Sequence, residues 1–353
     1  MCSSVTTSVT TRGNHEARSR VIEYYRDCRN DYRIIWRTDE NGTIHFGYFD
    51  DGAAINHPIV TFAQTLARGI VALAAAIVAA IVALVPVPAF REAAVRALRV
   101  AARGRVSRHD AAQRRMTEVC AEAVQPRPGE RLLDAGCGVG GTDRWLAERY
   151  RAFVCGLNVQ HDHLAIARQH QGIPANGGRV CFSRQDYTEM GIASESCDIV
   201  WGLESICHCQ DKSAFIREAS RVLRPGGRLM IADFFLAEDA LSDRDAFEVT
   251  EWTRGWAIPN LASTKGFFEL LEAHGFANVR QRDITANVLP SSHRLYKASL
   301  VASPIHRYLE RLGARSTIQG ANISAAHLQY RTLRDHVCAY AIFTAEKPIR
   351  RTS

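Results

Sequence analysis

Residues 131–141 read Arg-Leu-Leu-Asp-Ala-Gly-Cys-Gly-Val-Gly-Gly, and this stretch decides the fold. A short apolar run ends at Asp134, as expected of a buried strand that leads into a turn and then a helix. Four glycines follow, at Gly136, Gly138, Gly140 and Gly141. Glycines let the backbone pass close to a ligand, and the free N–H groups of a helix N-terminus point at it. The stretch therefore predicts a site for a nucleotide-like cofactor.

The glycine spacing by itself leaves two kinds of cofactor open. Gly136, Gly138 and Gly141 satisfy the G-x-G-x-x-G spacing of dinucleotide-binding enzymes. Those enzymes need an acidic residue about twenty positions further on to hold the ribose hydroxyls. After the next predicted strand, 152–157, no Asp or Glu appears before Asp162. An NAD(P)-dependent oxidoreductase stays open as an alternative, but the pattern favours another cofactor.

The same stretch resembles the first motif of class I S-adenosylmethionine-dependent methyltransferases. The likeness rests on Asp134, two residues before the first glycine, and on the additional glycine at position 140. In that family the loop wraps the methionine part of the cofactor, and the acid helps to fix its ammonium group. The resemblance implies S-adenosylmethionine as the cofactor.

Further segments resemble the same family in the same order. Gln185-Asp186-Tyr187 follows the third predicted strand, where these enzymes hold the adenine amino group with a carboxylate. Residues 197–201 resemble the buried fourth strand, and residues 221–228 the turn before the fifth. The likeness covers roughly 112–290 and continues, more weakly, to Pro348. The cofactor-binding residues expected from it are Asp134, Gly136, Gly138, Gly140, Asn158, Val159, Gln160, Gln185, Asp186, Tyr187 and Glu204.

The alternation of apolar strands and helical segments predicts an α/β fold. We expect a doubly wound, mostly parallel, seven-stranded sheet of the Rossmann-like methyltransferase type. The predicted strands are 131–134, 152–157, 179–183, 197–201, 228–234, 277–283 and 337–346. The predicted helices between them are 141–150, 160–170 and 211–222, and a short helix that ends at Pro126 precedes the first strand.

The chain divides into four predicted parts. Residues 1–16 are polar and rich in Ser and Thr, which predicts a disordered tail without a secretory signal. Residues 17–58 are expected to form an N-terminal lid, and 59–112 an apolar and basic helical insertion. The methyltransferase domain is predicted over 113–348, with a helical pocket insertion at 235–276.

The 59–112 insertion suggests contact with a membrane surface. Residues 69–90 carry no charge, and an arginine-rich stretch at 91–115 follows them in a chain of net charge +7. No aromatic residue interleaves these arginines, so we expect an anionic lipid surface through 69–108 and no nucleic acid as the partner. The apolar helix ends near Pro86, at the short limit for crossing a bilayer.

A full crossing would also place the lid and the catalytic domain on opposite sides of the membrane. A surface-lying or re-entrant helix is therefore favoured over a span, with a buried core helix as the other alternative. The ten cysteines form no C-x-x-C pair, which indicates a reducing compartment, no disulfide framework and no metal site. We expect a cytoplasmic, membrane-associated protein, and the sequence does not indicate an oligomeric state.

The catalytic candidates follow the fourth predicted strand, because ligands of open α/β sheets bind outside the carboxyl ends of the strands. Glu204 ends an apolar strand, so burial should raise its pKa and suit it to act as a base. A carboxylate paired with Arg or Lys is the alternative. His208 is the second candidate, with a histidine of the pocket wall as its alternative.

The acceptor is expected to be a lipophilic small molecule. Residues 204–212 resemble sterol, tocopherol and prenyl-diphosphate C-methyltransferases, whose acceptors are isoprenoids or other natural products of secondary metabolism. This implies methyl transfer to carbon, with N- or O-methylation of a hydrophobic natural product as the alternative. The predicted substrate-binding residues are Tyr24, Tyr25, Trp36, His45, Tyr48, Trp256 and Arg294. Arg294 would hold a polar head group, or else belongs to a solvated basic face.

Overall fold

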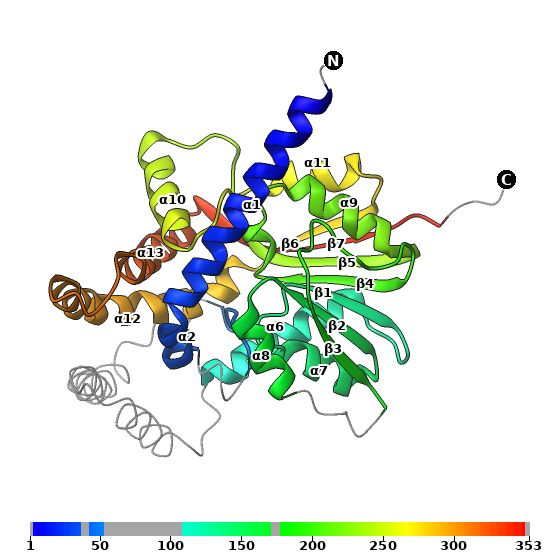
Figure 1. Ribbon diagram of the computed structural model, residues 1–353, viewed down its shortest axis with the longest axis horizontal. Coiled ribbons are helices and arrows are strands. Elements are labelled where there is room, and N and C mark those ends of the chain that lie inside the picture. Colours follow the sequence, from blue (N-terminus) through cyan, green and yellow to red (C-terminus); the bar gives the residue numbers. More distant parts are fainter. Residues whose placement is uncertain (1–2, 37–41, 53–107, 171–176, 350–353) are drawn as a thin grey trace.

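A seven-stranded sheet forms the centre of the protein (Figure 1). The computed structural model describes residues 3–36, 42–52, 108–170 and 177–349. The strand order is β3-β2-β1-β4-β5-β7-β6, and only β7 runs antiparallel to its neighbours. The strands are β1 (Arg131–Ala135), β2 (Phe153–Asn158), β3 (Arg179–Arg184), β4 (Cys197–Leu203), β5 (Leu223–Leu236), β6 (Ala277–Asp283) and β7 (Cys338–Glu346). This confirms the predicted doubly wound, mostly parallel sheet.

The central strands are apolar because both of their faces are covered. Every residue of β4 is buried, and β4 pairs with β1 in a parallel register that sets Val200 opposite Leu133. The strand order changes direction between β1 and β4. Strands β2 and β3 follow on one side of β1, and β5 lies on the far side of β4. The carboxyl ends of β1 and β4 therefore meet at the position where ligands of this fold bind.

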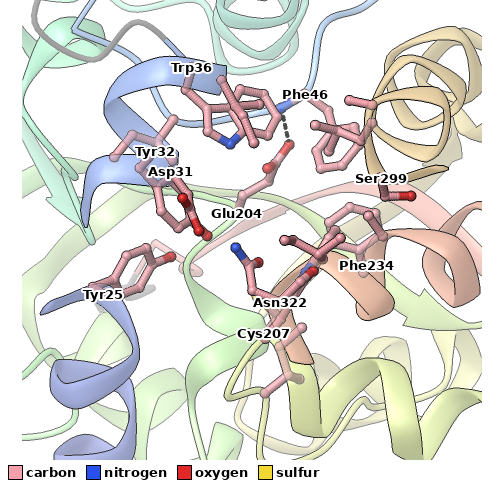
Figure 2. A pocket seen from close by; sticks show the side chains of 18 of the residues that line it. Tyr25, Asp31, Tyr32, Trp36, Phe46, Glu204, Cys207, Phe234, Ser299 and Asn322 are labelled. Atoms are coloured by element: carbon pink, nitrogen blue, oxygen red, sulfur yellow. Dashed lines mark hydrogen bonds between the residues drawn. The ribbon is translucent and has the colours of Figure 1, made fainter. Parts of the chain in front are cut away.

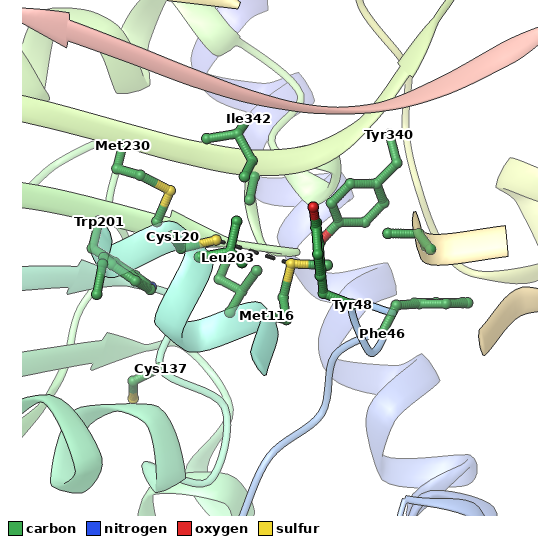
Figure 3. Packing of buried hydrophobic residues seen from close by; sticks show 14 of the residues in the cluster. Phe46, Tyr48, Met116, Cys120, Cys137, Trp201, Leu203, Met230, Tyr340 and Ile342 are labelled. Carbon is green, nitrogen blue, oxygen red and sulfur yellow. Dashed lines mark hydrogen bonds between the residues drawn. The ribbon is translucent and has the colours of Figure 1, made fainter. Parts of the chain in front are cut away.

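Helices cover both faces of the sheet and divide the core into two clusters. In Figure 3, Met116 and Cys120 of one helix pack against Trp201, Met230 and Ile342 of the sheet. That face carries α6 (Arg108–Val124), α7 (Gly141–Tyr150), α8 (His161–Gln169) and α10 (Asp243–Gly255). The opposite face carries α9 (Lys212–Val222) and α11 (Thr264–Ala273). A short 3-10 helix, η1 (Ile206–His208), follows β4.

Two long helices between β6 and β7 were not predicted from the sequence. They are α12 (Thr285–Arg311) and α13 (Thr317–Arg334), which pack against each other beside the sheet (Figure 1). Proline removes a backbone donor and normally ends a helix, yet α12 holds Pro290 and Pro304 in its interior. Packing of Leu295 and Ser299 against the rest of the protein outweighs this local preference.

The N-terminal segment folds as α1 (Ser3–Asp27) and α2 (Arg29–Ile35) and crosses the carboxyl edge of the sheet (Figure 1). The prediction of a disordered tail at 1–16 is therefore wrong, because α1 is helical from Ser3. Its second half is packed through Ala17, Val21 and Tyr24. Once such a nucleus is formed, each further helical turn costs little free energy, even for polar residues.

The 59–112 insertion also requires a correction at its end. Helix α6 begins at Arg108, so residues 108–112 belong to the catalytic domain, and its length exceeds the short helix expected there. The apolar stretch at 69–90 and the basic helix at 91–103 lie outside the described residues. Among the helices of the described part, none combines the length and the apolar character needed to cross a bilayer.

Candidate active site

The glycine loop after β1 brings two parts of the backbone into close approach. Gly136 adopts φ 115°, and a Cβ atom on it would lie 2.3 Å from the Cβ of Ser205, in the segment after β4. Gly140 adopts φ 78°, and a Cβ atom there would lie 2.5 Å from the ring of Phe182. Only glycine satisfies both the positive φ and the missing space. These glycines therefore let the loop at the end of β1 pack directly against Ser205 and Phe182.

Two buried carboxyl groups lie beneath this loop. In the described residues, Oδ1 of Asp134 and both carboxyl oxygens of Asp143 are buried and receive no donor. Burial raises the pKa of Asp134 well above its ordinary value, and the nearby carboxyl group of Asp143 raises it further. Burial likewise raises the pKa of Asp143 to about 7. The two groups are close enough to share one proton, and a cation would replace that proton.

The polar residues after β2 hold the rim of the loop. Asn158 donates from Nδ2 to the carbonyl of Gly138 at 3.2 Å and accepts from the backbone N–H of Gln160 at 2.9 Å. Val159, between them, is half-buried. These contacts fix the end of β2 against the glycine loop, although no acidic residue is present there.

The residues after β3 form the opposite rim. Asp186 accepts from the backbone and the hydroxyl of Thr188, and Tyr187 donates to the carbonyl of Ser205 at 3.0 Å. Gln185 accepts from the N–H of Gly191 at 2.8 Å. The second carboxyl oxygen of Asp186, Oδ2, is not used by Thr188 and lies at the edge of the site.

Helix α1 lies over both rims. Arg18 approaches Oδ2 of Asp186 at 3.6 Å, and Gln160 donates to the carbonyl of Ile22 at 3.1 Å. The predicted lid therefore covers the ends of β2 and β3 in this structure.

A cavity lies between the N-terminal helices, the end of β4 and the α12–α13 pair (Figure 2). Its wall is mostly apolar and aromatic, and a few polar groups point into it. The lining residues are Tyr25, Asp31, Tyr32, Ile35, Trp36, Ile44, Phe46, Glu204, Cys207, His208, Phe234, Trp256, Ile258, Leu295, Ala298, Ser299, Ala302, Asn322, Ile323 and Ala326. Such a cavity suits a lipophilic ligand with few polar groups.

Glu204 is the carboxylate of this cavity and occupies a strained backbone position. Its φ is 51°, in the left-handed region that residues other than glycine rarely adopt. Oε1 accepts from the N–H of Phe46 at 2.7 Å and from the hydroxyl of Tyr340 at 2.8 Å (Figure 2 marks the first). Burial raises the pKa of Glu204 well above its ordinary value. The expected direction of the pKa shift is confirmed, and the observed partners of the carboxylate are neutral donors rather than Arg or Lys.

His208 faces the same cavity from η1. Its Nδ1 lies 3.3 Å from the carbonyl of Ala257 and its Nε2 lies 3.2 Å from the hydroxyl of Tyr25. A carbonyl only accepts, so Nδ1 carries the proton and Nε2 accepts from Tyr25. Burial lowers the pKa of His208 to about 4. The imidazole is therefore neutral near pH 7.

Comparisons with known proteins agree with this geometry. Residues 133–231 match a family described as "Methyltransferase domain". Methyltransferase GfsG from Streptomyces halstedii is 33% identical over 190 residues, which cover 54% of this chain and 68% of the relative. The chain belongs to the class I S-adenosylmethionine-dependent methyltransferases. Its cofactor is S-adenosylmethionine.

Other similar proteins show the range of the family. The 2-methyl-6-phytyl-1,4-hydroquinone methyltransferase of Synechocystis sp. is 32% identical over 169 residues, covering 46% of this chain and 52% of that protein. Further curated relatives are named O-methyltransferases. These matches span about half to two thirds of the relatives' own length.

A solved structure shares the fold over nearly the whole chain. Geranyl diphosphate C-methyltransferase from Streptomyces coelicolor A3(2), in complex with Mg2+, geranyl diphosphate and S-adenosyl-L-homocysteine, has a TM-score of 0.61 and 14% identity. The match covers 94% of this chain and 97% of that one.

The residues of this methyltransferase fit the cofactor. Asp134 and Asp143 offer buried carboxyl groups to the ammonium group, and Gly138, with a φ of 53° and only Ile44 within 4 Å of its Cβ position, leaves room for a ligand beside the loop. Oδ2 of Asp186 would accept from a polar group of the adenosine part in place of its 3.6 Å contact with Arg18. When bound, S-adenosylmethionine supplies an electrophilic methyl group. The pocket around Glu204 would then receive the acceptor beside it.

The structure separates the predicted substrate-binding residues of this methyltransferase into two groups. Tyr25, Trp36 and Trp256 line the cavity, whereas Tyr24, His45, Tyr48 and Arg294 do not. The hydroxyl of Tyr24 bonds to Tyr32 and Asn322, and His45 contacts its neighbour Phe46 and, at 3.4 Å, Thr117.

The other two side chains serve structural contacts. Tyr48 accepts from Arg282 at 2.8 Å, with its ring beside the guanidinium groups of Arg115 and Arg282. Arg294 donates to the carbonyl of Ile35 at 3.0 Å and so ties α12 to α2. A role in holding a head group stays a prediction.

Two features of the site were missed from the sequence. Asp143 stands in the first turn of α7, where an acid is readily interpreted as a favourable helix-dipole charge. Its complete burial comes from the packing of α7 on β2, which the sequence does not display. The lining by α12 and α13 was missed because these helices were not predicted at all.

Proposed function

We propose that this methyltransferase transfers a methyl group to a lipophilic small-molecule acceptor, with a carbon of an isoprenoid or similar natural product as the first candidate. The single observation that carries the proposal is the cavity around Glu204, whose wall is aromatic and aliphatic apart from a few polar groups. The names of the Synechocystis relative and of the geranyl diphosphate enzyme support an isoprenoid acceptor.

Glu204 is proposed as the group that accepts the proton lost by the acceptor. Methylation of an alkene or aromatic carbon leaves a cation, which aromatic faces stabilise until a base removes a proton. Phe46, Trp256 and Phe234 supply such faces in the cavity, and their rings lie within 5.3 to 6.3 Å of each other. Only Oε1 of Glu204 is used by Phe46 and Tyr340, so Oε2 remains to take the proton.

O-methylation of a hydrophobic natural product is the second candidate. A neutral His208 with an accepting Nε2 suits the removal of a proton from a hydroxyl group, with Tyr25 displaced by the acceptor. The curated O-methyltransferases among the relatives support this reading. In it, Glu204 positions the acceptor and His208 takes the proton.

The experiment is methyl transfer from 13C-methyl S-adenosylmethionine to a panel of acceptors. The panel contains a prenylated hydroquinone, a prenyl diphosphate and a hydrophobic macrocyclic alcohol, and the NMR shift of the new methyl reports its attachment. We expect a C-methyl product that partitions into organic solvent. An O-methyl product would favour the second candidate, and methyl transfer to none of the three acceptors would contradict both.

We also propose that residues 69–108 bring the enzyme to a membrane surface from which a lipophilic acceptor is taken. The support is the uncharged stretch followed by arginines in the sequence. Deletion of 66–106 should abolish co-sedimentation with vesicles that contain phosphatidylglycerol. Unchanged sedimentation of the deletion variant would contradict this role.

A further inference from the structure

Two cysteines lie directly opposite each other on neighbouring strands at the edge of the sheet. Strand β3 is the edge strand, it runs parallel to β2, and the register pairs Cys155 with Cys181. Residues paired in this way point to the same face of the sheet, and neighbouring strands lie about 4.8 Å apart. That separation falls within the usual Cα–Cα range of a disulfide, about 4.4–6.8 Å.

The face that carries this pair is open to solvent. Val180 and Phe182 of β3 are buried on the side where α7 and α8 pack, so Cys181 points to the other side. Cys181 is exposed, Cys155 is half-buried, and Phe153 on the same side of β2 is 40% exposed. Cys28, Cys120, Cys137, Cys197, Cys207, Cys209 and Cys338, by contrast, are buried. Among the described cysteines, this pair is therefore the one that a small reagent reaches most readily.

The two thiols also differ in acidity because they contact each other. The hydrogen bond from Cys155 lowers the pKa of Cys181 to about 7, although burial acts in the opposite direction. The same contact, together with burial, raises the pKa of Cys155. Near neutral pH, about half of Cys181 is therefore thiolate, while Cys155 keeps its proton. An accessible thiolate beside a second thiol is the arrangement found in peroxide-reactive cysteine pairs.

We propose that Cys155 and Cys181 form a peroxide-reactive thiol pair that closes to a reversible disulfide between β2 and β3. The Cys181 thiolate attacks one oxygen of the peroxide, the O–O bond breaks, and a sulfenic acid and hydroxide are formed. The sulfur of Cys155 then attacks the sulfenic sulfur, and hydroxide leaves. The proton of Cys155 and one from solvent convert the two hydroxides to water, so two thiols are oxidised while one peroxide is reduced to two waters.

The Cys155–Cys181 pair lies on the two strands that lead to the cofactor site. Strand β2 leads to Asn158 and strand β3 leads to Asp186, which form the two rims of that site. A bond between Cys155 and Cys181 therefore joins the strands that carry the rims. Neither cysteine lines the cavity around Glu204.

Peptide mapping tests the proposal directly. Trypsin releases Cys155 in the peptide 152–168 and Cys181 in the five-residue peptide 180–184. After treatment of the full-length protein with hydrogen peroxide, we expect these two peptides joined by a disulfide, and separated again by dithiothreitol. Cys181→Ser and Cys155→Ala should each abolish the joined species. Peroxide-treated protein in which Cys181 is joined to another cysteine, or in which both thiols remain free, would overturn the proposal.

The acidity of Cys181 gives a second, independent measurement. Alkylation of Cys181 by iodoacetamide should follow a thiolate pKa near 7 in the wild-type protein. In Cys155→Ala the profile should move toward the ordinary thiol value, which slows alkylation at pH 7 roughly tenfold. Cys338→Ala, at a buried site far along the chain, serves as the matched control and should leave the profile unchanged. An identical profile in Cys155→Ala would contradict the coupled pair.

Discussion

The backbone N–H of Phe46 donates a 2.7 Å hydrogen bond to Oε1 of Glu204, 158 residues later in the chain. This contact joins the N-terminal segment to the carboxyl end of β4. It uses Oε1 of the carboxylate, as does the hydroxyl of Tyr340. The lid and the proposed base are therefore positioned by the same bond.

Replacement Glu204→Gln tests the proposed base. The amide keeps the volume and still accepts from Phe46 and Tyr340, but it does not take a proton. We expect kcat to fall by about 10²–10⁴-fold, with S-adenosylhomocysteine affinity within a few-fold of wild type. Glu272→Gln, an exposed position on α11, is the control. Steady-state kinetics measure kcat of the variant and of the control. A kcat of Glu204→Gln close to that of the wild-type protein would exclude Glu204 as the base.

Replacement Tyr25→Phe tests the bond between the lid and His208. It removes the 3.2 Å contact to Nε2 and keeps the aromatic ring in the wall. One hydrogen bond of this kind contributes about 1 kcal/mol, so we expect roughly a fivefold loss in kcat/KM for the acceptor. Tyr308→Phe, at a 63% exposed position, should have no effect. If Tyr25→Phe behaves like this control, the contact does not contribute to acceptor binding.

The Asp134–Asp143 pair predicts opposite pH trends for stability and for cofactor affinity. Because burial raises the pKa of Asp143 to about 7 in the folded protein, folding favours its protonated form. Its contribution to stability is present below its ordinary pKa near 3.8 and is lost as the pH rises toward 7. Affinity for the ammonium group should increase over the same window, because the ionised pair binds it better.

Calorimetry and thermal melts check both trends. In the cofactor-free protein, Tm should fall between pH 4 and pH 7, and S-adenosylhomocysteine binding near pH 7 should release protons. Asp143→Asn should flatten both trends, whereas Asp243→Asn, at the exposed start of α10, should not. His45 and His208 have pKa values lowered to about 4 and stay neutral across this window. If S-adenosylhomocysteine binding to the wild-type protein took up protons, or exchanged none, the proton shared by Asp134 and Asp143 would be contradicted.

Replacement Gly136→Ala tests the close packing of the glycine loop against Ser205. The new Cβ would collide with Ser205 at a φ of 115°, so we expect loss of cofactor binding together with a lower Tm. Gly275→Ala is a matched control, because Gly275 also has a positive φ of 80° but open space around it. The control should cost only about 1 kcal/mol of stability. If the two replacements changed cofactor affinity equally, the clash with Ser205 would not be the cause of the loss.

The sequence was sufficient for the sheet, because its strands carry strong local signals. Leu132, Leu133 and the mostly apolar β4 indicate buried parallel strands, and the glycines after Asp134 indicate the cofactor turn. Glu204 and His208 could be identified by their place after β4, since the topology brings that edge to the ligand.

The remaining parts of the site depend on packing between distant segments. Asp143 looks like an ordinary residue of a first helical turn until α7 is docked on Gly156. Helix α12 contains two prolines that argue against a helix, and its partner α13 is needed to compensate for them. The choice among Tyr24, Tyr25 and Tyr48 depends on which side of the lid faces the cavity, and aromatic residue type alone does not reveal that.

The most direct test of the account follows the methyl group itself. Purified protein is incubated with tritium-labelled methyl S-adenosylmethionine and a prenylated hydroquinone, and radioactivity in the organic phase is counted. Wild-type protein should move label into the organic phase, and Glu204→Gln should do so at least a hundredfold more slowly. Label that enters only water-soluble products, or equal rates for the two proteins, would contradict a lipophilic acceptor bound beside Glu204.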